Sequence, residues 1–352
     1  AIHPVELSFQ GWQQFSVPLE VFARIEAIRD NVTTVNFSLM RPRDDEPDLA
    51  GSLRLADLRL TTEPAGEVLE QVVPFPPADI NIPDDETFFG LLNLDLPALT
   101  AVRTAVEARD WPAARLAWAR HLTERTDPHW IWSRHDRERI ATMLAERGAP
   151  LEKAVPAAEK VLQRDFDWLG VRKVLERNIK WLQGPVEWTH VLSRHGYWTS
   201  LGHAWWATGN SAYADDWVTM LRDWIEDNPV PRFLTNDRGA EGTVWRTLET
   251  GIRGDLWFDI MELFMDAPAF DPDAKVLMTR SLLEQARHLQ RFETTFRAGN
   301  WQVVECTGLA VIGMMLPEFR ESAQWRERGF KYLVEHMEKD VFPDGAHHEL
   351  TP

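Results

Sequence analysis

Apolar residues recur at helical spacing from about residue 95 onward. The segment ALTAVRTAVEARDWPAARLAWARHL is amphipathic with the period of an α-helix, and Pro97 just before it suits a first helical turn. In TGNSAYADDWVTMLRDWIEDNP, a Gly-Asn stop and a Ser cap precede an amphipathic run that ends at Asn-Pro. The pattern therefore predicts one helical region from Pro97 and further helices near 134–148, 153–170, 195–209, 211–227, 244–266, 272–292, 299–316 and 320–339.

These predicted helices form hairpins of comparable length, and we find no strand-like alternation between them and no heptad seam. Antiparallel helix pairs with tryptophans near their ends are typical of an (α/α) toroid. We therefore predict a mainly α fold, an incomplete (α/α) toroid over 95–352. A compact helical bundle is the alternative.

The first 94 residues follow another pattern. Residues 1–62 contain short runs of β-branched and aromatic residues, and GSLRLADLRLTT alternates leucine with polar residues. The stretch from Gly51 to Leu60 resembles the closing strand of a carbohydrate-binding jelly roll. We predict a β-rich, partial β-sandwich segment over 1–62 and a linker rich in proline and acidic residues over 63–94, lying over the next domain.

Charge limits the possible partners. The net charge is −17, which disfavours nucleic acid, because its phosphates are bound by Lys and Arg. Residues 1–94 hold 16 acids and 6 bases, a net of −10, which leaves −7 for the remaining 258 residues. That longer part is nearly balanced in charge, so a local basic surface for an acidic ligand is compatible with it.

No apolar run is long enough to insert into a membrane, and Cys306 is the single cysteine.

Tryptophan is the strongest compositional signal. The chain has 17, and all except Trp12 lie at or after Trp111, whereas there are only three tyrosines. One interpretation is that they fill the core between helices. The other is that some form flat apolar platforms with an N–H group, which suit sugar rings.

Four segments in order resemble the heparinase II/III-like polysaccharide lyases. They are RHGYWTSLGHAWWATGNSAYADDWVTMLRDWIEDNP, VWRTLETGIRGDLWFDIMELF, RAGNWQVVECTGLAVIGMMLPEF and VFPDGAHHELTP. Heparin, heparan sulfate and oligoalginate lyases share this architecture. The resemblance, which covers roughly 95–352, implies β-elimination next to a uronic acid: a base removes the C5 proton while the neighbouring carboxylate takes up negative charge.

Asn300 in AGNWQ lies where this resemblance puts the group that neutralises the carboxylate. An amide supplies two N–H donors at any pH, and its effect is largest where charge develops. Asn300 is also a plausible helix cap, and the two roles are compatible. Trp301 follows where some members carry His. Glu305 is a further candidate, or a residue that only packs the helix.

Two more segments supply candidate substrate-binding residues. In SRHGYW, His195 is a candidate to bind a carboxylate or sulfate beside Tyr197 and Trp198, although a solvated helix start explains the same letters. In WRTLETGIR, helical spacing places three residues on one face, so that Arg253 is a candidate clamp on a sugar carboxylate or, alternatively, an internal ion-pair partner. These three residues are Trp245, Glu249 and Arg253.

The carboxyl-terminal PDGAHHELTP is rich in chemistry. The letters HHE suggest a metal, but no HExxH motif or cysteine pair accompanies them, so we predict no metal and no cofactor. The resemblance makes His348 and Glu349 substrate-binding residues and places the acid/base tyrosine just beyond Pro352. It also implies a carboxyl-terminal β-sandwich as the missing half. We therefore expect a fragment that has little or no activity by itself.

Two alternatives stay open. An (α/α)-toroid glycoside hydrolase needs a pair of carboxylates flanking the bond, for which Glu249, Glu305 and Asp344 are candidates without a pairing motif. A glycan-binding module without chemistry also fits the tryptophans. By resemblance alone, we expect a bacterial protein that is periplasmic or secreted and that binds an acidic polysaccharide or oligosaccharide.

Overall fold

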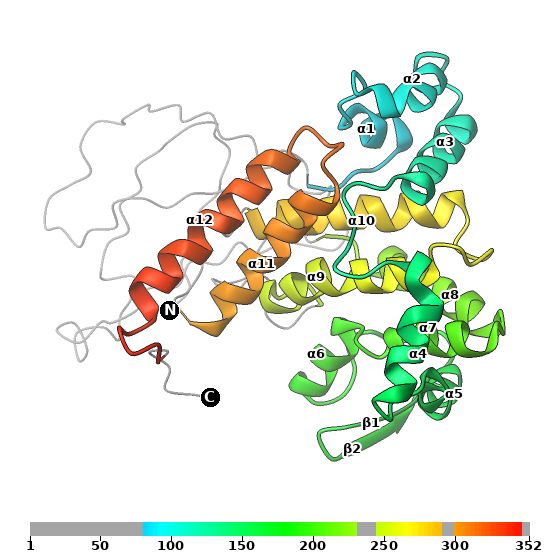
Figure 1. The fold of residues 1–352 in the computed structure, drawn as a ribbon, viewed down its shortest axis with the longest axis vertical. Coiled ribbons are helices and arrows are strands. Elements are labelled where there is room, and N and C mark those ends of the chain that lie inside the picture. Colours follow the sequence, from blue (N-terminus) through cyan, green and yellow to red (C-terminus); the bar gives the residue numbers. More distant parts are fainter. Residues whose placement is uncertain (1–79, 231–243, 291–298, 347–352) are drawn as a thin grey trace, which may run out of the picture. The chain divides into compact units, whose positions relative to one another are not determined.

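The computed structural model describes residues 80–230, 244–290 and 299–346, which belong to the second of two compact units, Asp79–Pro352. The predicted β-rich segment 1–62 and the first part of the predicted linker lie outside the described residues. From residue 80 onward the structure confirms a mainly helical fold (Figure 1).

The described residues form α-helices joined by short loops, three 3-10 turns and one β-hairpin. The α-helices are α1 Asp85–Gly90, α2 Thr100–Glu107, α3 Trp111–Glu124, α4 Arg137–Glu146, α5 Val155–Leu162, α6 Val186–Arg194, α7 Trp198–Thr208, α8 Ala212–Asp227, α9 Thr247–Phe264, α10 Pro272–Gln290, α11 Asn300–Met315 and α12 Ser322–Asp340. The 3-10 turns are Pro97–Leu99, Arg134–Asp136 and Leu151–Ala154, and the hairpin strands are β1 Asp165–Trp168 and β2 Val171–Val174.

Three consecutive odd-numbered helices run parallel. Gly202 of α7 lies against Leu263 near the end of α9, while His195, just before α7, contacts Trp257 in the middle of α9. Between α9 and α11, Gly251 lies against Val304 and Gly254 against Gly308. The amino-terminal ends of α9 and α11 therefore lie side by side, whereas α7 begins beside the middle of α9. Helices α8 and α10 return the chain between these helices, as in a toroid of helix hairpins (Figure 1).

Glycine permits the closest crossing. A Cβ on Gly251 would lie 2.7 Å from the carbonyl oxygen of Val304, and a Cβ on Gly308 would collide with the backbone of Gly251. Since α9 and α11 touch backbone to backbone here, their first turns are held in a fixed relation. This contact positions the candidate site.

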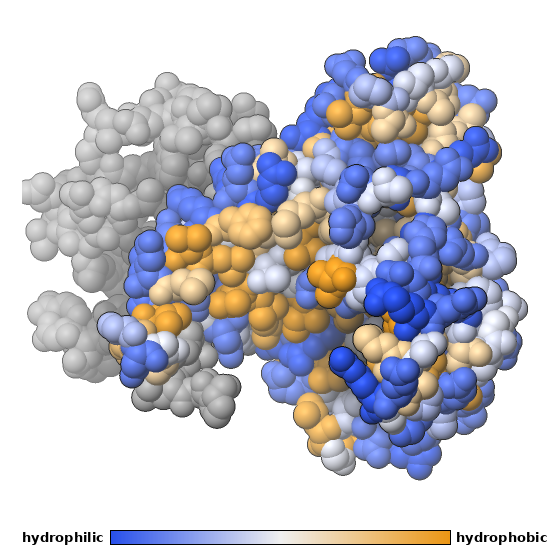
Figure 2. All heavy atoms as spheres, viewed as in Figure 1, coloured by the Kyte–Doolittle hydropathy of each residue, from blue (hydrophilic) through white to orange (hydrophobic). Residues whose placement is uncertain are grey.

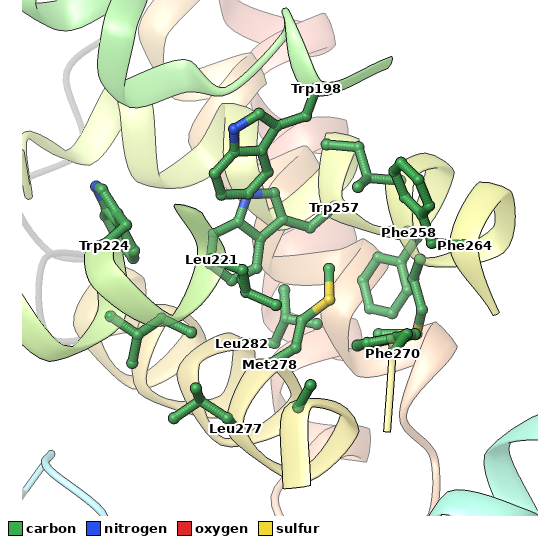
Figure 3. Packing of buried hydrophobic residues seen from close by; sticks show 14 of the residues in the cluster. Trp198, Leu221, Trp224, Trp257, Phe258, Phe264, Phe270, Leu277, Met278 and Leu282 are labelled. Carbon is green, nitrogen blue, oxygen red and sulfur yellow. The ribbon is translucent and has the colours of Figure 1, made fainter. Parts of the chain in front are cut away.

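Aromatic and aliphatic side chains of α7 to α10 form a large part of the core (Figure 3), which also includes residues from α1, α3 and α11. Trp198, Trp224 and Trp257 are fully buried, and the Trp217 ring stacks on Phe264 with centroids 4.2 Å apart. Most of the described tryptophans are buried in this way. The core-filling interpretation of these tryptophans is therefore correct.

The structure corrects three details of the sequence analysis. The predicted helix 153–170 is wrong beyond Leu162, because residues 165–174 form an antiparallel hairpin. Leu169 and Gly170 both adopt positive φ, as a two-residue turn between twisted strands requires. Helix α6 was missed. Part of the predicted linker forms α1, whose Phe88 and Phe89 are buried.

Candidate functional site

Asn300 is the first residue of α11 and is exposed. Glu305, five residues further along, is buried and accepts a hydrogen bond from Thr247 Oγ1 at the start of α9. The sequence-predicted Glu305 therefore joins α11 to α9 below Asn300. Of its two expected roles, packing is the one that the described contacts show.

Arg246 connects the two helix ends from the other side. Its guanidinium lies 4.8 Å from the ring centroid of Trp301, which follows Asn300. Cation–π contacts of this kind contribute about 0.5–2 kcal/mol, depending on exposure. The pair brings a positive charge to the residue next to Asn300.

Glu249 is the centre of the polar cluster. It has no exposed surface, and Arg246 binds it through two nitrogens, with Nη2 2.7 Å from Oε1. Arg194, at the end of α6, donates to the same oxygen from Nε at 3.2 Å and from Nη2 at 2.9 Å. One buried carboxylate thus orients two arginines, and we call Glu249, Arg246, Arg194 and His190 the arginine junction.

Charge and burial oppose each other in this junction. Burial acts to raise the pKa of Glu249, but the hydrogen bonds and charge of Arg246, with smaller effects of His190 and Arg194, bring it below the ordinary value. Burial also lowers the pKa of His190, so its neutral form is favoured. His190 Nδ1 lies 3.8 Å from Glu249 Oε2, and neither ring nitrogen has a hydrogen-bond partner among the described residues.

His195, Tyr197 and Trp198 lie at the start of α7, but not on a solvent-facing surface. His195 adopts φ 65° as the C-cap of α6, is fully buried, and stacks on Trp198 at 3.9 Å. Its Nδ1 accepts from Trp257 Nε1 at 3.2 Å, and burial, followed by the charge of Arg253, lowers its pKa strongly. The solvated helix start is therefore wrong, and this imidazole packs the core (Figure 3 shows Trp198 and Trp257).

Arg253 and Trp245 are interior as well. Arg253 is fully buried and donates to the carbonyls of Ser193 and Val244, both at 3.0 Å, to Gln285 at 3.1 Å and to Thr250 at 3.2 Å. The guanidinium contacts carbonyls rather than the expected Glu249, because Arg246 and Arg194 bind that carboxylate. Trp245 is 3% exposed and donates to the carbonyl of Asn228.

His348 and Glu349 lie outside the described residues. Two of the tyrosines are engaged in the interior: the Tyr197 hydroxyl is buried and its pKa is raised by burial, and Tyr213 donates to Glu159 at 2.6 Å. The described ranges contain no group of three or more His, Cys, Asp or Glu side chains placed to bind a metal. No described helix combines the length and apolar character needed to cross a membrane.

Sequence reasoning missed Arg246 and passed over Arg194 and His190. The signal was present for Arg246, because an arginine at a helix N-cap can pair with a glutamate three residues later. His190 was missed, and Arg194 was named within SRHGYW but given no role, because α6 itself was not predicted. Within this helix, positions 190 and 194 are one turn apart and face Glu249 together.

The chain is similar to known proteins in sequence and in fold. Residues 88–352 match the family model described as Heparinase II/III N-terminus. The heparin-sulfate lyase of Pedobacter heparinus is 28% identical over 273 residues, covering 75% of this chain and 39% of that protein. The corresponding protein of Bacteroides stercoris is 27% identical over 283 residues, covering 75% of this chain and 40% of its own length.

Solved structures show the same fold. A crystal structure of a heparan sulfate lyase HepC mutant from Pedobacter heparinus superimposes with a TM-score of 0.62 at 27% identity, covering 76% of this chain and 42% of that one. The chain therefore spans about two fifths of the length of the relatives it matches. With the family model covering residues 88–352, and with the mainly α fold of the incomplete (α/α) toroid type confirmed, the chain belongs to the heparinase II/III family.

Proposed function

We propose that this protein is part of a polysaccharide lyase that cleaves uronic-acid-containing glycans, of the heparan sulfate class, by β-elimination. The observation that carries the proposal is the exposed Asn300 at the amino-terminal end of α11, in a chain whose relatives are named heparin-sulfate lyases. The helix end and the nearby Arg246 both favour a bound anion.

In this proposal Asn300 neutralises the uronate carboxylate. Its amide N–H groups donate to a carboxylate oxygen, which gains charge as the C5 proton leaves, and the C4–O bond then breaks to give a C4=C5 double bond. Hydrogen bonds that strengthen as charge develops lower the barrier instead of only improving binding. Trp301 supplies an apolar face beside the amide.

We further propose that the acid/base is a tyrosine just beyond Pro352 in a longer form of the protein. Tyr197 and Tyr213 do not suit this role, since one hydroxyl is buried and the other is bound to Glu159. This longer form would be a bacterial periplasmic or secreted protein. Detection of it only in the cytosol would contradict that expectation.

The carboxyl-terminal part of this longer form is also proposed as a partner of α12. Phe330, Val334 and Met337 lie on one side of this helix and are 47%, 55% and 67% exposed. Figure 2 shows apolar surface over α11 and α12. An apolar face of this kind favours docking of another part of the protein over contact with water.

The test is an elimination assay on heparan sulfate, alginate and hyaluronan, which follows the ultraviolet absorbance of the new double bond. We expect activity in a polypeptide extended beyond residue 352 and little in the 352-residue chain. Asn300→Ala in the extended form should lower kcat by about 100- to 1,000-fold with an unchanged unfolding curve. New reducing ends without that absorbance would instead indicate a hydrolase, and full activity of the Asn300→Ala variant would exclude the assigned role.

A further inference from the structure

Arg194 and Arg246 share Glu249, but they differ in exposure. The side chain of Arg246 is 5% exposed, and its nitrogens bind both oxygens of Glu249 while its plane lies over Trp301. The side chain of Arg194 is 30% exposed. Arg194 is therefore the member of the pair that a ligand reaches without rearrangement of the junction.

The hydrogen bonds of Arg194 leave part of its guanidinium available. Nε and Nη2 donate to Glu249 Oε1, while no described residue accepts from Nη1. A guanidinium that is fixed through one edge by a buried carboxylate is already oriented, so binding through its other edge costs little side-chain entropy. An anionic oxygen is the natural partner for that edge.

The charges within the junction do not cancel. Two arginines and the carboxylate of Glu249 leave one positive charge, because the buried His190 favours its neutral form. The nearest further acid, Glu187, is 61% exposed and lies 3.5 Å from Arg246 and 4.0 Å from Arg194. Water screens such an exposed carboxylate, so it compensates the charge only weakly.

His190 supplies an independent observation. It is 2% exposed, and both ring nitrogens are without a hydrogen-bond partner among the described residues. Buried polar groups in proteins normally have partners, so an unpaired imidazole calls for an explanation such as a bound water or ion or a functional role. The junction therefore has hydrogen-bonding capacity beyond what its own fold uses.

We propose that Arg194 binds a second anionic group of the glycan, a sulfate or a carboxylate on a sugar next to the uronate held at Asn300. This assignment rests on the proposed function and adds a specificity-determining residue to it. Glu249 acts as the positioning residue that aims Arg194, and Arg246 links the junction to Trp301. The chain would then select glycans that carry negative charge on neighbouring sugars.

The test compares Arg194→Gln with two controls. Arg194→Lys keeps the charge but loses the planar fork. Arg222→Gln removes an arginine of similar exposure, 33%, whose 3.0 Å ion pair with Asp271 lies outside the junction. Calorimetry on the 352-residue chain measures Kd for heparan sulfate oligosaccharides and for the same oligosaccharides with their sulfates removed.

We expect Arg194→Gln to weaken binding of the sulfated oligosaccharides by about 10- to 100-fold, as the loss of hydrogen bonds between charged groups predicts. Arg194→Lys should lose part of this affinity, and Arg222→Gln should leave it unchanged. A loss confined to sulfated oligosaccharides identifies the anion as sulfate. An equal loss with and without sulfate identifies the carboxylate of a neighbouring uronate.

Equal affinity of wild type and Arg194→Gln would overturn the proposal, as would an equal loss in the Arg222→Gln control. So would a wild-type chain that binds none of these oligosaccharides. A failure of the proposed function would give a different result. In that case an extended polypeptide would bind the oligosaccharides through Arg194 but would form no double bond.

Discussion

The interior around Arg253 and the arginine junction use the same residue types in opposite ways. Arg253, His195 and Trp198 are fully buried, and Arg253 donates from every nitrogen of its side chain to the protein itself. In the junction, Arg194 is 30% exposed and no described residue accepts from its Nη1. The difference shows that residue type identifies neither region: an arginine with an exposed, unused donor edge can bind a ligand, whereas an arginine whose donors are all used inside the protein cannot.

The largest expected effect is the loss of stability on replacing the buried Arg253. Arg253→Leu keeps much of the apolar volume but leaves the carbonyls of Ser193 and Val244 and the amide of Gln285 without their donor. We expect the free energy of unfolding, measured with urea, to fall by about 3–5 kcal/mol. Arg194→Gln should cost about 1–2 kcal/mol in the same experiment, because Arg246 still neutralises the buried Glu249, and similar costs for both variants would mean that the two arginines are structurally equivalent.

The tryptophans allow the same contrast. Trp198→Ala removes a fully buried ring that stacks on His195, and should lower the free energy of unfolding by about 3–5 kcal/mol. Trp301→Ala removes a partly exposed ring whose contact with Arg246 contributes about 1 kcal/mol. Thermal denaturation measures both, and a larger loss for Trp301→Ala would contradict the division between interior and junction.

The glycine contact connects the two regions. Gly251→Ala places a methyl group 2.7 Å from the carbonyl oxygen of Val304, so α9 and α11 must separate. We expect a cost of about 1–3 kcal/mol in the free energy of unfolding, together with weaker glycan binding, because Arg246 and Asn300 move apart. The matched control is Gly90→Ala, where a Cβ meets nothing within 4 Å and both quantities should stay unchanged.

The smallest expected effect is a pH dependence. Burial lowers the pKa of His190 in the folded protein below its ordinary value of 6.5, so the unfolded chain takes up the proton first as pH falls. The stability contributed by neutral His190 is thus present above about pH 6.5 and is lost below it, with a slope of at most about 1.4 kcal/mol per pH unit. The pKa of Glu249 is also lowered in the folded protein, so the stability contributed by its charged form is lost in turn below about pH 4.5.

His190→Asn should reduce the loss of unfolding free energy between pH 6.5 and pH 5, measured by urea denaturation at each pH, and should leave the part that comes from the buried His195 and His203. His129→Asn, which removes a 79% exposed imidazole, is the control and should leave the curve as in wild type. An unchanged curve for His190→Asn would show that the charged imidazole is tolerated inside the junction.

Sequence analysis located most of the fold. The periods and caps placed α8, α9, α10, α11 and α12 to within a few residues, because these long helices have strong local signals. The β-hairpin was missed although its letters DFDW alternate and Leu169-Gly170 is a turn. Its strands have only four residues each, so the prediction extended the preceding helical pattern into the first strand.

The candidate site also has a part that could be predicted from the sequence and a part that could not. Local patterns along the chain were sufficient to predict the long helices, the family resemblance, and the position of Asn300 at a helix start, since periods and helix boundaries are local properties of the chain. Long-range packing, by contrast, sets which arginine binds Glu249, buries His195 and Arg253, and leaves Arg194 with an exposed edge. These facts depend on α6, α9 and α11 meeting across more than a hundred residues, and burial and pairing at such a meeting have no local signature in the sequence.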